Sequence, residues 1–164
     1  MGLVLQGQKG KSPGITLGRS WVHVTCHPAA LPQTAAVATF NVNNGEVFVH
    51  LMYGRVTTVI QTQTNNLKVT SNPTTGTSGD VASNLDISAD EAGTLYILEG
   101  DGTALIGTNA GQGWLAIGAP NPFILNAGTI DIETSASNTG RIKWHIFYEP
   151  LVEGATVTKV SGIE

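Results

Sequence analysis

Apolar and polar residues alternate between Gly128 and Pro150. On both sides of a short Ser, Asn, Thr and Gly stretch, every second residue is a large apolar one, which is typical of two half-buried β-strands joined by a turn. A hairpin in which Thr134 faces Gly140 collects opposite charges on one face and apolar side chains on the other. Its facing pairs are Glu133 with Arg141, Asp131 with Lys143, Ile132 with Ile142, and Ile130 with Trp144. Since a slip by one residue would move the charges to the apolar face, the pattern predicts a hairpin in this register.

The rest of the chain from Trp21 onward shows short apolar or alternating runs separated by turn residues. No ten-residue stretch combines helical periodicity with helix-favouring residues. Besides 129–134 and 141–148, we expect strands at 21–26, 35–42, 46–53, 55–64, 67–71, 84–88, 94–99, 103–108, 123–125 and 156–160. The segment from Asn72 to Asp80 has turn residues only, and we expect an exposed loop there.

The dipeptide Asp101-Gly102 separates two apolar runs. Asp-Gly is a strong signal for a two-residue hairpin turn, because both central positions of that turn need a positive φ. The turn would place Leu98 opposite Leu105 in a ribbon that is apolar on both faces, as expected between two layers or two subunits. The predicted fold is therefore all-β: a single-domain antiparallel β-sandwich, jelly-roll-like, with an extended N-terminal arm.

The N-terminal twenty residues differ from the rest of the chain. They contain glycine at positions 2, 7, 10, 14 and 18 together with Pro13, a composition that neither forms a helix nor buries a continuous apolar face. We expect an extended arm over 1–20 and a β-sandwich domain over 21–164, which is long enough for one core without disulfides or metal. A neighbouring subunit or a second protein is the simplest binding partner for the arm; the alternative is an arm folded back on its own domain.

Charged residues are scarce. They make up 12% of the 164 residues, about half the usual share, and the segments 20–45 and 102–130 contain no Asp, Glu, Lys or Arg. Soluble monomers normally spread charge over their surface. Neutral polar faces of this kind suit contacts between subunits; the alternative is a monomer kept soluble by Thr and Asn.

Several classes of partner and compartment are disfavoured. The net charge is −4 and the few Lys and Arg are scattered, so we expect no nucleic acid partner. The single cysteine, Cys26, forms no internal disulfide, fits a reducing cytosol and is expected to pack as a small apolar side chain. The apolar run at the N-terminus, Met1 to Leu5, is too short for a signal peptide or a membrane span. We therefore expect no membrane contact and a protein that is synthesised in the cytoplasm.

Three local motifs resemble parts of known chemical sites. Gly10-Lys11-Ser12 resembles the end of a phosphate-binding loop, but Leu5 stands where the first glycine belongs and Pro13-Gly14 follows in place of a helix. His23, Cys26 and His27 suggest zinc by proximity, yet His23 and Cys26 point to opposite faces of a strand and there is no evident fourth ligand. Asp86, Asp90 and Glu91 lack the ligand spacing and glycine of a calcium loop. We predict no metal and no cofactor.

No residue set has the spacing of a catalytic site. No histidine has an identifiable acidic partner along the chain, so the sequence predicts no catalytic residues and no enzyme. Three tryptophans, Trp21, Trp114 and Trp144, could stack on sugar rings. Trp144 fits the core better, whereas Trp114 lies in a glycine-rich stretch, so glycan binding stays an alternative.

A series of turn and strand residues carries a resemblance to a known group. The segments are Gly93-Thr94-Leu95-Tyr96, Gly107-Thr108-Asn109-Ala110-Gly111, Gly128-Thr129-Ile130-Asp131 and Tyr148-Glu149-Pro150-Leu151, the last continuing into Gly154-Ala155-Thr156-Val157. Together with the glycine-rich opening they resemble small β-sandwich head proteins of tailed bacteriophages, the capsid decoration or cement proteins. The likeness runs from about Glu46 to Val160.

The resemblance implies a structural virion protein on the outer capsid surface. Such a protein bridges major capsid protein subunits as a homo-oligomer, with a trimer favoured and a dimer possible, and has no catalytic residues. The residue pattern agrees with this on three points: a charge-poor surface, an arm and a ribbon that is apolar on both faces. The alternative from another class is a receptor- or glycan-binding domain of a phage head fibre or tail.

Overall fold

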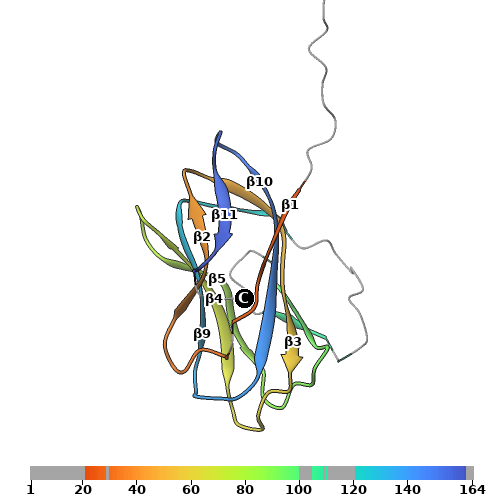
Figure 1. The fold of residues 1–164 in the computed structure, drawn as a ribbon. Coiled ribbons are helices and arrows are strands. Elements are labelled where there is room, and N and C mark those ends of the chain that lie inside the picture. Colours follow the sequence, from red (N-terminus) through yellow and green to blue (C-terminus); the bar gives the residue numbers. More distant parts are fainter. Residues whose placement is uncertain (1–20, 29, 100–104, 109, 111–120, 162–164) are drawn as a thin grey trace, which may run out of the picture.

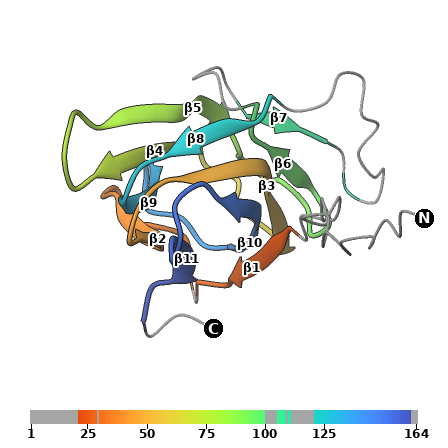
Figure 2. The ribbon, with the colours of Figure 1, turned by 90° about the horizontal axis from the view of Figure 1, so that it is seen from above.

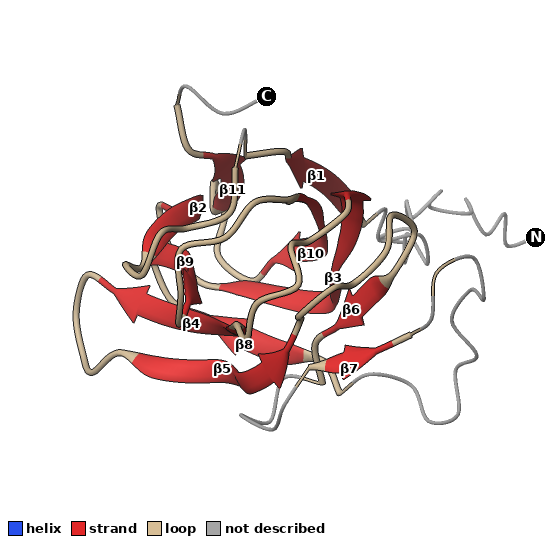
Figure 3. Cartoon of the chain, turned by 90° about the horizontal axis from the view of Figure 1, so that it is seen from below, coloured by secondary structure: helices blue, strands red, loops and turns tan. Residues whose placement is uncertain are grey.

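The computed structural model describes residues 21–28, 30–99, 105–108, 110 and 121–161 (Figure 1). These residues form strands and loops without a helix (Figure 3). The strands are β1 (Val22–Cys26), β2 (Val37–Asn43), β3 (Val47–Thr58), β4 (Asn66–Pro73), β5 (Gly79–Asp86), β6 (Leu95–Ile97), β7 (Ile106–Gly107), β8 (Phe123–Leu125), β9 (Gly128–Thr134), β10 (Arg141–Pro150) and β11 (Thr156–Lys159).

The strands make two antiparallel sheets that lie against each other as two layers (Figure 1). Among the described residues, sheet A has six strands in the order β1-β10-β3-β6-β7, with β8 also paired to β3; sheet B has five in the order β11-β2-β9-β4-β5. The edge strands β1 and β11 lie close together (Figure 2). The prediction of an all-β antiparallel sandwich is confirmed.

The core fills the space between the two sheets. It is built from the inward positions of alternating strands, as expected when each sheet has one buried face. The largest fully buried side chains include Phe40, Leu67, Ile130 and Ile132 from sheet B and Met52, Tyr96, Trp144 and Ile146 from sheet A.

The predicted hairpin between 128 and 150 is wrong. β9 pairs with β2 and β4 in sheet B, whereas β10 pairs with β1 and β3 in sheet A, so the chain crosses from one sheet to the other after Thr134. Ile132, Ile142 and Trp144 still lie together, but across the core instead of along one sheet. Alternation identifies the buried face of each strand; it does not distinguish a neighbour in the same sheet from one in the opposite layer.

The charged pairs predicted for that hairpin are wrong for the same reason. Glu133 lies opposite Lys68 of β4, and the Lys68 Nζ is 3.1 Å from the Glu133 Oε2. Lys143 lies opposite Arg55 of β3, not opposite Asp131. Glu133 therefore has its cation partner within sheet B, whereas the cations Arg55 and Lys143 lie opposite each other in sheet A.

A second correction concerns the strands predicted at 46–53 and 55–64. They form the single strand β3, which ends at Thr58. Gly54 does not break the strand, because its role is to leave space: a Cβ there would lie 2.8 Å from the Ile142 Cγ2 and 2.9 Å from the Trp144 Cζ3. The glycine thus accommodates the buried tryptophan ring.

The β6–β7 ribbon has the predicted register. Tyr96 pairs with Gly107 and Ile97 with Ile106, the pairing that a two-residue turn at 101–102 requires; the turn itself lies outside the described residues. The loop expected at 72–80 is a shorter hairpin connection, because β4 continues to Pro73 and β5 already begins at Gly79. Residues 74–78 between them are exposed, as predicted.

Candidate functional site

Four aromatic or imidazole rings form a row on the outer face of sheet A. They are His23 from β1, His145 and Phe147 from β10, and Tyr53 from β3, and we call them the ring row. The centroids of Tyr53 and His145 are 4.6 Å apart with planes 6° apart, and those of His23 and Phe147 are 4.2 Å apart at 3°. His23 also stacks on His145 at 5.3 Å. Four near-parallel rings therefore stand side by side on one exposed face.

The sheet register creates this row. His145 lies directly between Thr25 of β1 and Tyr53 of β3, and Phe147 lies opposite His23. The neighbouring residues along β10, Trp144 and Ile146, are buried on the inner face of the sheet. His145 and Phe147 therefore point outward, because side chains alternate along a strand. The Nε2 of His23 and the Nδ1 of His145 are 3.0 Å apart, so one imidazole donates a hydrogen bond to the other.

A second group of rings lies beside the row. Trp21, half exposed at 54%, stacks on His50 with centroids 4.3 Å apart, and Phe48 meets the same imidazole edge to face at 4.9 Å. The His50 Nε2 is 3.7 Å from the Glu149 Oε2. We call Trp21, Phe48 and His50 the tryptophan cluster.

An apolar hollow of about 260 Å³ adjoins the ring row on the other side. Its walls come from β3 and β6, and almost all of the exposed wall surface is apolar. The lining residues are Leu51, Tyr53, Arg55, Leu95 and Ile97. Ile97 is 2% exposed but does not belong to the core cluster, because Tyr96 takes the inward position of β6.

The ionisable groups near the ring row include the imidazole of His145 and the cations Arg55 and Lys143. Burial, followed by the nearby His23, Lys143 and Arg55, lowers the pKa of His145 from 6.5 to about 4, so this ring is neutral at pH 7. Arg55 and Lys143 are direct cross-strand partners. Within the described part of the chain, neither forms an ion pair with a carboxylate.

The zinc candidates do not converge, as the strand argument predicted. Cys26 faces the core, where burial raises the pKa of its thiol to about 11, while His23 stands on the outer face. His27 is hydrogen-bonded through Nε2 to the Thr57 Oγ1 at 2.9 Å. Among the described residues, no group of three or more His, Cys, Asp or Glu side chains could hold a metal ion.

The acidic residues considered for calcium serve the β5–β6 connection. Hydrogen bonds from Ser88 lower the pKa of Asp86. Asp90 accepts a hydrogen bond from the Tyr96 hydroxyl, whose pKa is raised mainly by burial and also by this bond. Both carboxylates therefore have local partners that explain their positions.

The tryptophans divide between core and surface. Trp144 is 1% exposed, which confirms it as a core residue, whereas Trp21 belongs to the outer face of sheet A. Trp114 and the phosphate-loop mimic at 10–12 lie outside the described residues.

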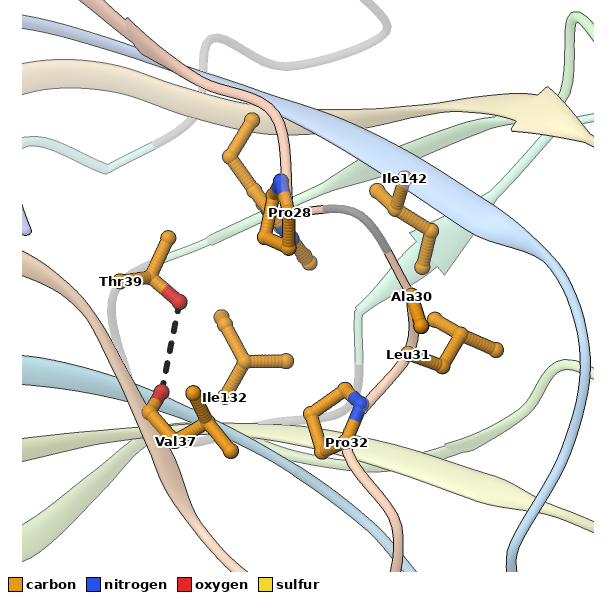
Figure 4. A pocket seen from close by; sticks show the side chains of 9 residues that line it. Pro28, Ala30, Leu31, Pro32, Val37, Thr39, Ile132 and Ile142 are labelled. Atoms are coloured by element: carbon orange, nitrogen blue, oxygen red, sulfur yellow. Dashed lines mark hydrogen bonds between the residues drawn. The ribbon is translucent and has the colours of Figure 1, made fainter. Parts of the chain in front are cut away.

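A small apolar pocket lies at the end of the sandwich, beneath the β1–β2 connection (Figure 4). Its volume is about 70 Å³, and Pro28, Leu31, Pro32, Ile132 and Trp144 are among its walls. The Thr39 hydroxyl, one of its few polar groups, donates to the Val37 carbonyl. The pocket is well below the size of known small-molecule sites, which begin at roughly 300 Å³.

The sequence pattern does not predict the ring row, because its members lie on the outward side of their strands and not among the alternating apolar residues that mark the core. The signal was present in the residue types: positions 143, 145, 147 and 149 of β10 are Lys, His, Phe and Glu, and a phenylalanine in the solvent phase marks a face that is not simply wet.

Comparison with known proteins does not identify this chain: no family model, curated protein or solved structure matches it. No helix that could cross a membrane occurs in the described ranges.

Proposed function

We propose that this protein is a structural virion protein that decorates and stabilises a phage capsid by bridging major capsid protein subunits. The sequence resemblance to small head proteins of tailed phages suggests the setting. The observation that carries the proposal is the outer face of sheet A. There the ring row adjoins an apolar hollow and two cations, Arg55 and Lys143, that have no carboxylate partner among the described residues. A solvated sheet face is normally polar, so this one favours contact with another chain.

The proposed role is mechanical and not enzymatic. On a capsid, each contact is weak, but a molecule that binds two or more neighbouring subunits gains from the effective concentration of the second site. A homo-oligomer, with a trimer favoured and a dimer possible, would multiply the contacts further. The protein would be made in the host cytoplasm and would act on the outer capsid surface.

The jelly-roll topology and the N-terminal arm are parts of this proposal. The jelly-roll assignment is supported by chain crossings between layers: β2 and β3 lie in different sheets, and so do β9 and β10. The arm, residues 1–20, would lie along the capsid surface and bridge subunits. Its composition, rich in glycine and without aromatic residues, supports an extended segment that gains its contacts from a partner.

Co-sedimentation tests the proposal. Purified full-length protein is mixed with empty capsids of the phage that encodes it, and we expect it in the capsid pellet at a saturable ratio, with capsids that resist heat or osmotic shock better. A protein that stays in the supernatant at all concentrations overturns the proposed function. Deletion of residues 1–20 should reduce occupancy; unchanged occupancy removes the arm from the mechanism.

The second candidate is a receptor- or glycan-binding domain of a head fibre or tail. Trp21 favours it, because this exposed indole has one face on His50 and could offer the other to a sugar ring. A glycan array with the native protein, Trp21→Ala and Trp114→Ala separates the two functions. Glycan binding that is lost in Trp21→Ala would support this candidate.

A further inference from the structure

We propose that the outer face of sheet A docks a protein segment that carries carboxylates beside a large apolar side chain. The carboxylates would lie over Arg55 and Lys143, and the apolar side chain would enter the hollow between β3 and β6. This inference rests on the proposed function, because it names the chemistry of the partner at the same face.

The like-charged pair is the first argument. Arg55 and Lys143 are direct cross-strand partners, and like charges in that position destabilise a sheet. Within the residues that the structure describes, no carboxylate lies within ion-pair distance of either. Arg141, one pleat further along β10, is a third cation without an ion pair in the same ranges. A carboxylate supplied by a partner would turn this repulsion into attraction.

The orientation of the ring row is the second argument. In a strand, side chains stand roughly perpendicular to the sheet. The rings of Tyr53, His145, His23 and Phe147 are near-parallel and cover one another's faces, so their edges point toward a partner. The edge of an aromatic ring is the positive part of its quadrupole, and it attracts carboxylate and carbonyl oxygens.

The hollow is the third argument. Leu51, Leu95 and Ile97 give it aliphatic walls, while Arg55 supplies its charged group. An apolar side chain is therefore the matching occupant, and a neighbouring carboxylate on the same segment would reach the cations. This combination specifies acidic-apolar sequence, not acidity alone.

Two other occupants fit the face less well. A second copy of this chain would bring the same three cations against each other, and Glu149, the carboxylate of this face, already faces His50. Single-stranded nucleic acid binds by stacking bases on free ring faces along a basic groove. Here the faces of the row are occupied by one another, and the net charge of the chain is −4.

The test uses full-length, isotope-labelled protein and short synthetic peptides followed by NMR. The probe alternates leucine and aspartate; one matched peptide has alanine for leucine, another has lysine for aspartate, and a short oligothymidine is the nucleic acid arm. We expect the leucine–aspartate peptide to bind and to change the chemical shifts of Tyr53, Leu95 and His145. Its affinity should fall as the salt concentration is raised. The alanine and lysine peptides should bind at least about tenfold more weakly, as should the oligothymidine.

Two charge-reversal variants provide the control. Arg55→Glu and Lys159→Glu change the net charge equally at exposed strand positions, but Lys159 lies on β11 of sheet B. Like charges at an interface are strongly unfavourable. Arg55→Glu should therefore reduce the affinity for the leucine–aspartate peptide by about tenfold or more, and Lys159→Glu should reduce it by less than about twofold.

The inference is overturned if the leucine–aspartate peptide does not bind at millimolar concentration, if the alanine, lysine or nucleic acid probe binds as well, or if the two variants behave alike. Capsid co-sedimentation separates this failure from that of the proposed function. If the peptide binds as expected but the protein does not co-sediment with capsids, the proposed function alone fails. If Arg55→Glu still binds capsids fully, the function stands and this docking face does not.

Discussion

The outer faces of the two sheets differ in how their charged side chains are paired. On sheet B, Lys68 contacts Glu133 at 3.1 Å and Asp80 at 3.9 Å, and Asp80 also accepts a hydrogen bond from Thr70. On sheet A, Arg55 and Lys143 face each other beside stacked rings. Within the described residues, Lys68 of sheet B has carboxylate partners in its own sheet, whereas Arg55 and Lys143 of sheet A have none.

The two sheets of this charge-poor chain carry different kinds of polar side chain. Asn43 and Thr158 join neighbouring strands of sheet B through a side-chain hydrogen bond, so neutral polar residues stabilise that face locally. The four histidines of the chain lie in or directly beside strands of sheet A, and none lies in sheet B. Ring contacts and imidazole side chains are thus concentrated on the sheet that we propose for docking.

The largest expected effect separates the inner and outer sides of sheet A. Trp144→Ala should destabilise the protein by about 3–5 kcal/mol, because a buried ring is lost and a cavity is left between the layers. Trp21→Ala, at an exposed position of the same sheet, should change the free energy of unfolding by less than about 1 kcal/mol. Urea unfolding of both variants measures the contrast; equal losses would mean that Trp21 contributes to the core.

A glycine in each sheet gives the next comparison. Gly54→Ala should cost about 1–3 kcal/mol, since the added methyl group would overlap Ile142 and the Trp144 ring. Gly79→Ala in β5 meets no atom within 4 Å, and we expect a change within about 0.5 kcal/mol. Thermal or urea unfolding again provides the readout. A silent Gly54→Ala variant would contradict the close packing of β3 on β10.

The fold was largely predictable from the sequence because burial follows side-chain alternation. The all-β class, most strands and the β6–β7 register came from local patterns, and local patterns suffice when a short turn joins partners, as at 101–102. The pairing of β9 and β10 did not, because the sheet that each strand joins depends on distant partners such as Lys68. The predicted division of β3 into two strands is wrong for the same reason, because the residue that requires Gly54, Trp144, lies far along the chain.

The candidate site was less predictable than the fold. The ring row forms only when three strands pair in the right register, and His23 is more than a hundred residues from Phe147 along the chain. No residue spacing in the sequence therefore predicts it. The meeting of Arg55 with Lys143 was likewise hidden, since the sequence offered Asp131 as a plausible partner for Lys143. Only the misplaced phenylalanine at 147 gave a local hint.

Acid should destabilise the protein through His145, which lies on the outer face of sheet A. The folded-state pKa of His145 is lowered from 6.5 to about 4, so the unfolded chain takes up the proton first. The stabilising effect is complete above about pH 6.5 and is lost as the pH falls toward 4. Full burial would make it worth roughly 3 kcal/mol, and solvent screening at this half-exposed face reduces it to about 1 kcal/mol.

Urea unfolding at a series of pH values measures this effect, with His145→Gln as the matched variant. The variant should flatten the dependence between pH 6.5 and 4. If native protein and variant have parallel profiles, the proton is taken up elsewhere.

The smallest expected effect is also the most direct test of the contrast between the faces. Lys68→Ala removes the cation that Glu133 and Asp80 share, and an exposed ion pair of this kind contributes about 0.2–1 kcal/mol. Arg55→Ala removes one of two like charges that face each other, so the isolated protein should be unchanged or more stable by a few tenths of a kcal/mol. The two truncations should therefore have opposite signs in low-salt urea unfolding, and both effects should shrink as salt is added. A loss of stability in Arg55→Ala as large as that in Lys68→Ala would mean that Arg55 already has a compensating partner within its own chain, and the distinction between a self-sufficient face and a face built for a partner would fail.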